Sequence, residues 1–304
     1  NNSMLVTMQQ IGKNKLEFLF FVPLSSTQQI TEAQNLIKQT FPNEKISSQK
    51  LDNKVEMYNL QDAVTSENKV SFAIYNNTLI AGVSRISVEN ALKSIINGSN
   101  VTSLKSFMRV KKTAGAKVDA NLYINFSQFS NLAYLFAAPS IKNDSFLESI
   151  LASWAELDIS IKSNAILLNG YTSVESEKEY FSIFSKQDPV KFELSQVIPA
   201  GTSSFIAFGI SNKTLFKSNY ESYLKKNNLY TEYQNGLKEI NNTFTSPTQD
   251  KIDAVKDFYD IVDNEMAMVY ASVSSNNVYE NTFAILKVVN QTQAKEKILG
   301  MLDL

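Results

Sequence analysis

The chain has 304 residues, of which 43% are hydrophobic, and its formal net charge is −1. This charge argues against a nucleic-acid partner, because neutralising phosphates requires an excess of positive charge on one surface. The sequence contains neither histidine nor cysteine, which excludes disulfides, thiol nucleophiles, imidazole acid–base catalysis and most transition-metal sites. We therefore expect no cofactor and no metal, and we assign no catalytic residue.

The N-terminal part of the chain predicts strands that pair as hairpins. Residues 16–22 are apolar except for Glu17, and we interpret this run as a strand covered on both faces. Residues 70–75 and 78–83 have strand composition and flank Asn76 and Asn77. Because asparagine tolerates positive φ, this segment predicts a tight β-hairpin.

Five helices are predicted from apolar residues at helical spacing, each next to a residue that can cap its first turn. They begin at Thr27, Ser87, Asp144, Asn212 and Asp250.

Further strands are predicted in the second half of the chain. Leu157, Ile159 and Ile161 alternate with polar residues, which predicts a strand with one buried and one solvent-facing side. A turn at 163–164 leads into a second strand of the same hairpin. Other strands are expected at 205–210, 266–273 and 282–289. Hairpins mixed with helices favour an α+β fold, in which helices pack on one face of antiparallel sheets.

Prolines and a glycine between residues 187 and 201 predict a boundary within the chain. We expect one α+β unit at 1–190 and a second at 191–304, and the two can also pack as one body.

The order strand, turn, strand, helix occurs at both ends of the chain. Residues 2–22 and the helix after them share this order with residues 264–289 and the final helix. This similarity predicts a repeated strand–hairpin–helix unit. Since Asn1 is not an initiator residue, we expect the chain to be a piece that lacks the start of its first unit and the end of its last.

Two stretches resemble one protein family. Residues 72–84 followed by 88–92, and residues 103–107 followed by 120–125, are similar to domain-of-unknown-function family 3352, a group of bacterial envelope proteins. Residues 198–202 resemble the start of that family's unit. The resemblance implies a bacterial protein exported to the periplasm or cell surface, in some cases through a lipid anchor on a segment absent from this chain. It implies no catalytic residue.

The best candidate for chemistry is the carboxylate pair Glu156 and Asp158. Residues two apart on a strand share a face and lie about 6–7 Å apart, which approaches the spacing of the two carboxylates in glycoside hydrolases. The alternating pattern also explains both residues as the solvent-facing side of the strand.

A second candidate is an aromatic surface on the helical region after Asn212. Exposed tyrosines there would stack on sugar or peptide, whereas buried ones would fill the core. The residues concerned are Tyr220, Tyr223 and Tyr230. A stripe of five aspartates between 250 and 263 is interpreted as a solvated helix face.

These observations favour a non-catalytic binding or scaffold module of an exported bacterial cell-envelope protein, with a protein or glycan of the envelope as its partner. No run of 18 apolar residues occurs, so no transmembrane segment is predicted. Two alternatives stay open: a carboxylate-based glycan hydrolase that uses Glu156 and Asp158, and a carrier of an apolar ligand between sheet and helices.

Overall fold

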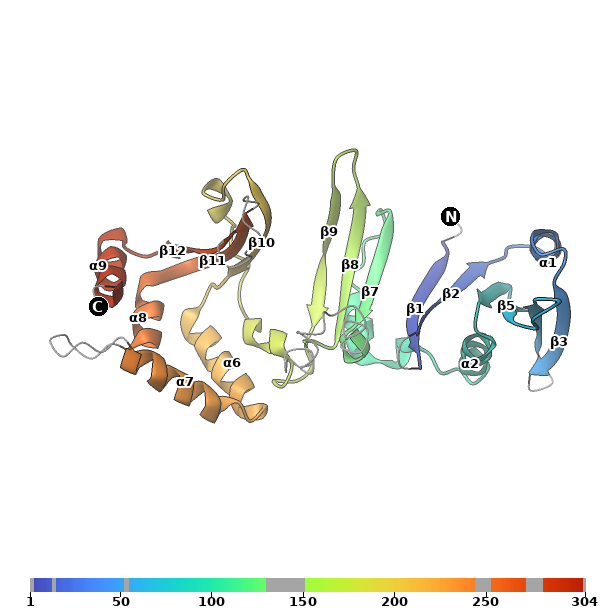
Figure 1. Cartoon of the computed structure of the whole chain (residues 1–304), viewed down its shortest axis with the longest axis horizontal. Helices are drawn as coiled ribbons and strands as arrows, with labels where there is room; N and C mark the ends of the chain where they lie inside the picture. The colour runs from blue at the N-terminus through green and yellow to red at the C-terminus, as the bar shows by residue number, and fades with distance from the viewer. Residues whose placement is uncertain are drawn as a thin grey trace. The chain divides into compact units, whose positions relative to one another are not determined.

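The computed structural model describes residues 3–12, 15–51, 55–129, 151–243, 253–271 and 281–302. Helices and three antiparallel sheets in these residues confirm the predicted α+β class (Figure 1). The chain forms two compact units, Asn1–Glu148 with Glu156–Leu168, and Ser149–Ala155 with Asn169–Leu304. The boundary segment predicted at 187–201 lies within the second unit.

The first unit contains a six-stranded antiparallel sheet in the order β1-β2-β6-β5-β4-β3. Its strands are β1 (Leu5–Ile11), β2 (Lys15–Pro23), β3 (Lys45–Leu51), β4 (Val55–Gln61), β5 (Asn68–Tyr75) and β6 (Thr78–Gly82). Helix α1 (Thr27–Thr40) connects β2 to β3, and α2 (Arg85–Ile96) follows β6.

The core of this unit lies between the sheet and α2. Fully buried Met57, Ala73 and Ile80 from the strands form one cluster with Val88 and Leu92 of α2. The helical spacing of Val88 and Leu92 places both side chains on the same face of α2, so this face provides the apolar cover for the sheet.

The predicted hairpin at residues 70–83 is confirmed. Strands β5 and β6 pair with Tyr75 opposite Thr78, and the two residues between them, Asn76 and Asn77, have φ values of 46° and 55°. Two positive φ values are what a two-residue hairpin turn with the twist of the strands requires.

The start of α2 is shifted from its predicted position. The N-cap is Ser84, not Ser87, and the Ser84 hydroxyl accepts a hydrogen bond from the Ser87 backbone N–H at 3.3 Å. The carboxylate of Glu17 in β2 accepts hydrogen bonds from the Ser84 backbone N–H and the Ser87 hydroxyl. A strand residue distant in sequence therefore fixes where this helix begins.

The expectation that residues 16–22 are covered on both faces is wrong. Glu17 and Leu19 are buried, but Phe18 and Phe20 on the opposite face of β2 are 49% and 41% exposed. The sheet has its main core on the α2 side. The face of β2 that carries Phe18 and Phe20 is therefore apolar and exposed.

A second sheet has the order β7-β8-β9. It consists of β7 (Ala120–Asn125), β8 (Trp154–Ile161) and β9 (Ile166–Ser173). The short helices η1 (Val101–Ser103) and α3 (Lys105–Lys111) precede β7. The predicted turn at 163–164 is present, because the Lys162 backbone N–H donates to the carbonyl of Ala165.

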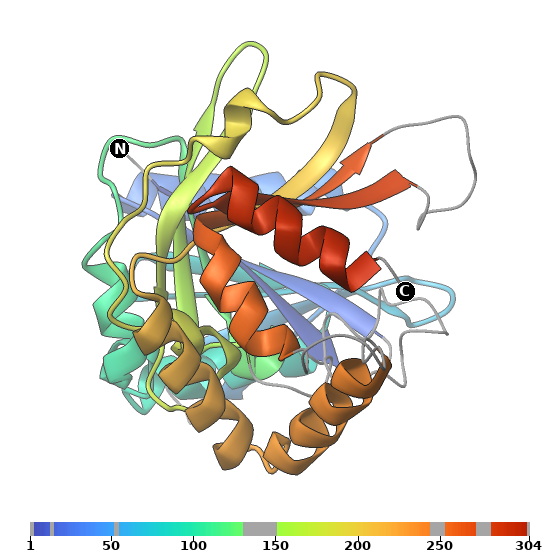
Figure 2. The ribbon, with the colours of Figure 1, turned by 90° about the vertical axis from the view of Figure 1, so that its left-hand side faces the viewer.

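The third sheet has the order β10-β11-β12 and is covered by helices from the second unit. Figure 2 shows α8 and α9 next to each other over this sheet, where Ile261, Val262 and Ala294 are buried against Leu286 and Val288. The elements of this unit are η2 (Tyr180–Phe184), η3 (Leu194–Gln196), β10 (Thr202–Gly209), α6 (Lys213–Lys226), α7 (Tyr230–Thr243), α8 (Ala254–Ile261), β11 (Val262–Ala271), β12 (Thr282–Val288) and α9 (Gln291–Leu302).

The predicted helix starts have mixed outcomes. Thr27 is the first residue of α1, and Asn212 caps α6. Helix α8 is capped by Asp253, whereas Asp250 and the helix predicted from Asp144 lie outside the described residues. Within the described residues, no helix has the length and apolar character needed to cross a membrane.

We predict that Leu92→Ala lowers the free energy of unfolding by about 2–5 kcal/mol, because it leaves a cavity in the packed face of α2. Chemical denaturation followed by circular dichroism measures this effect. The matched control is Ile86→Ala on the same helix, where the side chain is 66% exposed and the expected change is within about 0.5 kcal/mol. Equal effects of the two substitutions would contradict the assignment of the core to this face.

Candidate functional site

The carboxylate pair lies in β8, but not on a solvent-facing side. Glu156 is fully buried, and Asp158 is half-buried. The interpretation of these residues as a solvated face is therefore wrong for Glu156. The neighbouring residues of the first unit cover that face of β8.

Polar groups from the segment after α3 and from β7 surround the pair. The Asn121 amide donates to Asp158 at 2.7 Å and to Glu156 at 3.4 Å. The backbone N–H of Gly115 donates to Asp158 at 2.8 Å, and the Thr113 hydroxyl donates to Glu156 at 3.5 Å. The two carboxyl groups therefore attach the 113–121 segment to β8.

The surroundings of Glu156 raise the pKa of its carboxyl group. Burial raises the pKa of Glu156, and a hydrogen bond to Asp158 and the negative charge of Asp158 raise it further. A carboxyl group with a raised pKa next to a second carboxyl group is an arrangement that general acids use. Here, however, the acid is enclosed by protein groups, whereas a catalytic acid must reach its substrate.

Close packing around Gly115 leaves no room for a side chain at this position. A Cβ atom on Gly115 would lie 2.6 Å from the Asp158 carboxylate oxygen and 3.1 Å from the Val118 side chain. Only glycine allows the backbone N–H to approach Asp158 at hydrogen-bonding distance without displacing the carboxylate.

A second buried carboxylate, Glu265 in β11, holds the second unit together. It accepts hydrogen bonds from the backbone N–H groups of Glu193 and Leu194 at 2.6 and 3.0 Å. The ammonium group of Lys287 in β12 donates to Glu265 at 3.2 Å and to Glu193 at 3.0 Å. Burial by itself raises the pKa of Glu265, but the two N–H donors and Lys287 together hold it below its ordinary value.

The tyrosines proposed as an aromatic surface belong to a cluster within the second unit. Tyr223 is buried, and its ring lies edge-on to Tyr180 at 5.6 Å. Tyr220 and Tyr230 are half-buried and both pack against Tyr233, at 5.5 and 6.5 Å. These contacts stabilise the packing of α6 on α7 and η2.

The aspartate stripe is not simply solvated. Lys297 from α9 binds Asp257 at 2.6 Å and Asp260 at 3.0 Å, and Lys256 binds Asp260 at 2.7 Å. These lysines lower the pKa of Asp260 to about 2. Part of the stripe thus attaches α8 to α9.

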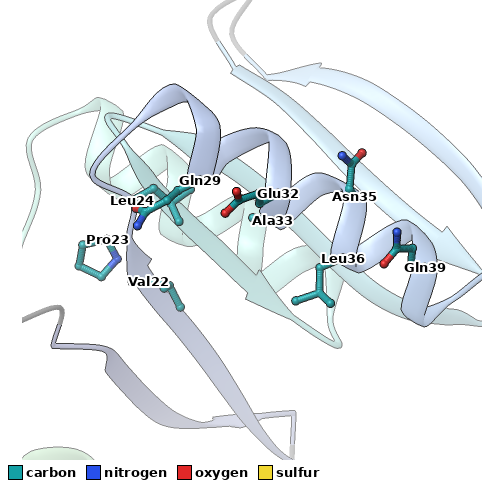
Figure 3. A pocket seen from close by; sticks show the side chains of 9 residues that line it. All are labelled: Val22, Pro23, Leu24, Gln29, Glu32, Ala33, Asn35, Leu36 and Gln39. Atoms are coloured by element: carbon teal, nitrogen blue, oxygen red, sulfur yellow. The ribbon is translucent and has the colours of Figure 1, made fainter.

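Neither of the two best-formed pockets contains the carboxylate pair. One is a groove between the end of β2 and α1, which Figure 3 shows with its lining side chains. Its apolar lining includes Val22, Leu24 and Leu36, and four polar side chains of α1 also line it. The other lies beside Phe181 and Phe184. In the described part of the chain, no group of three or more acidic residues is arranged to hold a metal ion.

Sequence patterns gave no signal for the partners of the buried carboxylates. Gly115 and Asn121 lie 43 and 37 positions from Asp158, and Leu194 lies 71 positions from Glu265. Each contact joins segments that only the fold brings together.

Comparisons with protein-family models, with characterised proteins and with solved structures found no match to this chain. The resemblance to the envelope family stays a prediction. The function is therefore inferred from the residues of this chain and their contacts.

We predict that Gly115→Ala lowers the free energy of unfolding by about 1–3 kcal/mol, because the added methyl group breaks a buried charge-assisted hydrogen bond. The fluorescence of Trp154, the only tryptophan of the chain, reports on β8 during urea unfolding. As a control, Gly201→Ala places its Cβ in open space and should cause no loss. A neutral Gly115→Ala variant would show that the Gly115–Asp158 contact is dispensable.

The two buried glutamates should affect the pH dependence of stability in opposite directions. The raised pKa of Glu156 means that wild-type stability falls as pH rises above about 4, the ordinary range of glutamate, through the folded-state pKa. The Glu156→Gln variant lacks this fall and gains stability relative to wild type at pH 7. The lowered pKa of Glu265 gives a contribution that is present at pH 7 and lost on acidification. Urea midpoints measured from pH 3 to 8 should therefore diverge with opposite sign for Glu156→Gln and Glu265→Gln, and parallel profiles would contradict this assignment.

Proposed function

We propose that the chain is a non-catalytic binding or scaffold module of an exported bacterial cell-envelope protein. The main support is an exposed apolar surface on the β1–β2 hairpin, called here the hairpin face. It consists of Val6, Met8, Phe18 and Phe20, which are 41–49% exposed.

The pairing of the strands gathers these four side chains on one side. Val6 lies opposite Phe20 and Met8 lies opposite Phe18, and directly opposed residues of an antiparallel pair project to the same face. Leu19 between the two phenylalanines points to the other side, into the core with α2. Contiguous apolar surface of this kind favours an interaction site.

The chemistry of the hairpin face favours a protein partner over a glycan. All four side chains are apolar, so the face carries no polar group that would recognise sugar hydroxyls. Two phenylalanines and a methionine are among the residue types enriched at protein–protein interfaces. An extended partner segment or another apolar sheet face matches this surface.

The hydrolase alternative is less well supported. Its acid would be Glu156, which is fully buried and bound to Thr113 and Asn121. Turnover measured on a panel of polysaccharides, with Glu156→Gln as the control, decides this alternative. Activity that disappears in that variant would replace the proposed function.

The carrier alternative depends on the groove beside α1 (Figure 3). Five of its nine lining residues are apolar, and the other four, Gln29, Glu32, Asn35 and Gln39, add polar groups along α1. This composition suits an amphipathic protein segment better than a lipid.

We predict that a photo-crosslinking residue introduced at Phe20 forms a discrete adduct with an envelope protein in cells that produce the full-length protein. The same residue at Val64, which is 91% exposed on the β4–β5 connection, should form none. Mass spectrometry of the adduct and fractionation of the cells give the measurement. Equal labelling from both positions, or recovery of the protein with the cytosol, would refute the proposal.

A further inference from the structure

Two hairpins in this chain have the same register. In β1–β2, Leu5 lies opposite Phe21 and Thr7 opposite Leu19. In β11–β12, Ala267 lies opposite Ile285 and Val269 opposite Phe283. Matching Leu5 to Ala267 and Phe21 to Ile285 brings the four pairs from Leu5–Phe21 to Met8–Phe18 onto the four pairs from Ala267–Ile285 to Tyr270–Thr282.

The helices that follow begin at the same point of this match. Ser26 lies as far beyond Phe21 as Asn290 lies beyond Ile285. The Ser26 side chain accepts a hydrogen bond from the backbone N–H of Gln29, and that of Asn290 accepts one from Gln293. The hairpin and the first turn of its helix thus form one structural motif that occurs twice.

The two copies of the motif differ in their neighbours. Strand β2 pairs with β1 on one side and with β6 on the other, whereas β12 pairs with β11 alone among the described residues. Conversely, β11 pairs with β10 on its far side, and no described strand pairs with the far side of β1. Within the described residues, each copy therefore has a neighbouring strand where the other copy has none.

The helices beside the two hairpins differ in a similar way: the packing that one unit has is open in the other. In the second unit, Ile261 at the end of α8 packs against Leu286 and Val288 beside α9. In the first unit, the matching residues are Val22 in β2 and Leu24, which follows the end of β2 at Pro23. Both line the open groove beside α1 (Figure 3).

We propose that the open edge of β12 is a docking edge for a β6-type strand of a further unit of this kind, carried in the same polypeptide and joined through α9. An unpaired strand edge presents backbone N–H and C=O groups that another strand can satisfy. In the docked state the new strand would follow the register of β6 on β2, where Leu19 lies opposite Gly82 and Phe21 opposite Ile80. This proposal is independent of the hairpin face and goes beyond the proposed function.

The packing around Gly82 indicates which residue the docking strand needs at the matching position. A Cβ on Gly82 would lie 2.5 Å from the Leu19 side chain and 3.3 Å from the Phe18 carbonyl oxygen. Phe283 occupies the position of Leu19 in β12. The docking strand therefore requires a glycine opposite Phe283 and apolar residues before it, as in Leu79-Ile80-Ala81-Gly82.

The route of the chain in the first unit supports a partner in the same polypeptide. After α1, the chain forms β3, β4 and β5 and then returns through β6 to pair with β2. Because α9 follows β12 as α1 follows β2, a continuation with the same elements reaches the open edge of β12.

The test extends the full chain after Leu304 with a second copy of residues 41–97. The junction keeps the distance in sequence between the helix cap and the appended segment, because Leu304 lies as far beyond Asn290 as Thr40 lies beyond Ser26. Hydrogen exchange of the amides in β12 should slow by about tenfold or more relative to the unextended chain, because these amides acquire partners. In the matched control, Gly82→Val in the appended copy alone should abolish the protection.

Three results would overturn the proposal. The first is unchanged exchange of β12 in an extended chain whose appended copy is itself protected. The second is equal protection by the Gly82→Val control. The third is protection of β12 in the unextended chain that grows with protein concentration, since this assigns the edge to a second copy of the chain.

A peptide titration decides the question if the extended chain does not fold. A fluorescent peptide of residues 76–84 should bind the unextended full chain saturably, and the same peptide with Gly82→Val should not. Absence of saturable binding, or equal binding of both peptides, counts against the docking edge.

Discussion

Buried and half-buried carboxylates on strands accept hydrogen bonds from backbone N–H groups of distant segments in both units. Glu17 fixes the start of α2, Asp158 binds the Gly115 backbone, and Glu265 binds the backbone of residues 193 and 194. Hydrogen bonds to ionised groups are stronger than neutral ones, and a buried carboxylate without such partners would be strongly destabilising. The sheets, helices and connecting segments of each unit therefore depend on these few contacts.

The surroundings of the two buried glutamates, Glu156 and Glu265, shift their pKa values in opposite directions. Burial and the neighbouring Asp158 carboxyl group raise the pKa of Glu156, whereas two N–H donors and Lys287 hold the pKa of Glu265 below its ordinary value. Neither group lines the groove beside α1 or the pocket beside Phe181 and Phe184. Perturbed pKa values often mark active sites, but structural networks produce them too. In this protein the geometry around both glutamates favours the structural role, and the proposed binding role depends instead on exposed apolar surface.

A scaffold role agrees with how the apolar surface is distributed. The hairpin face lies on the side of β1–β2 opposite the α2 core, and among the described residues β12 pairs with β11 alone. Proteins usually protect long apolar strand edges, because such edges associate with other strands. A hairpin that has a neighbour in one copy and an open edge in the other is what an array of joined units would produce.

The sequence by itself determined the α+β class, most strands and the hairpin turn at Asn76 and Asn77. These features depend on local patterns: alternation, helical spacing, caps and turn residues. It did not predict β3 and β4, because the polar residues of β3, an edge strand of the sheet, give little apolar alternation. Only the tertiary structure decided that Glu156 is buried, that β2 exposes one apolar face and that α2 begins at Ser84. These features depend on contacts between segments tens of residues apart, and no local pattern encodes which segments meet.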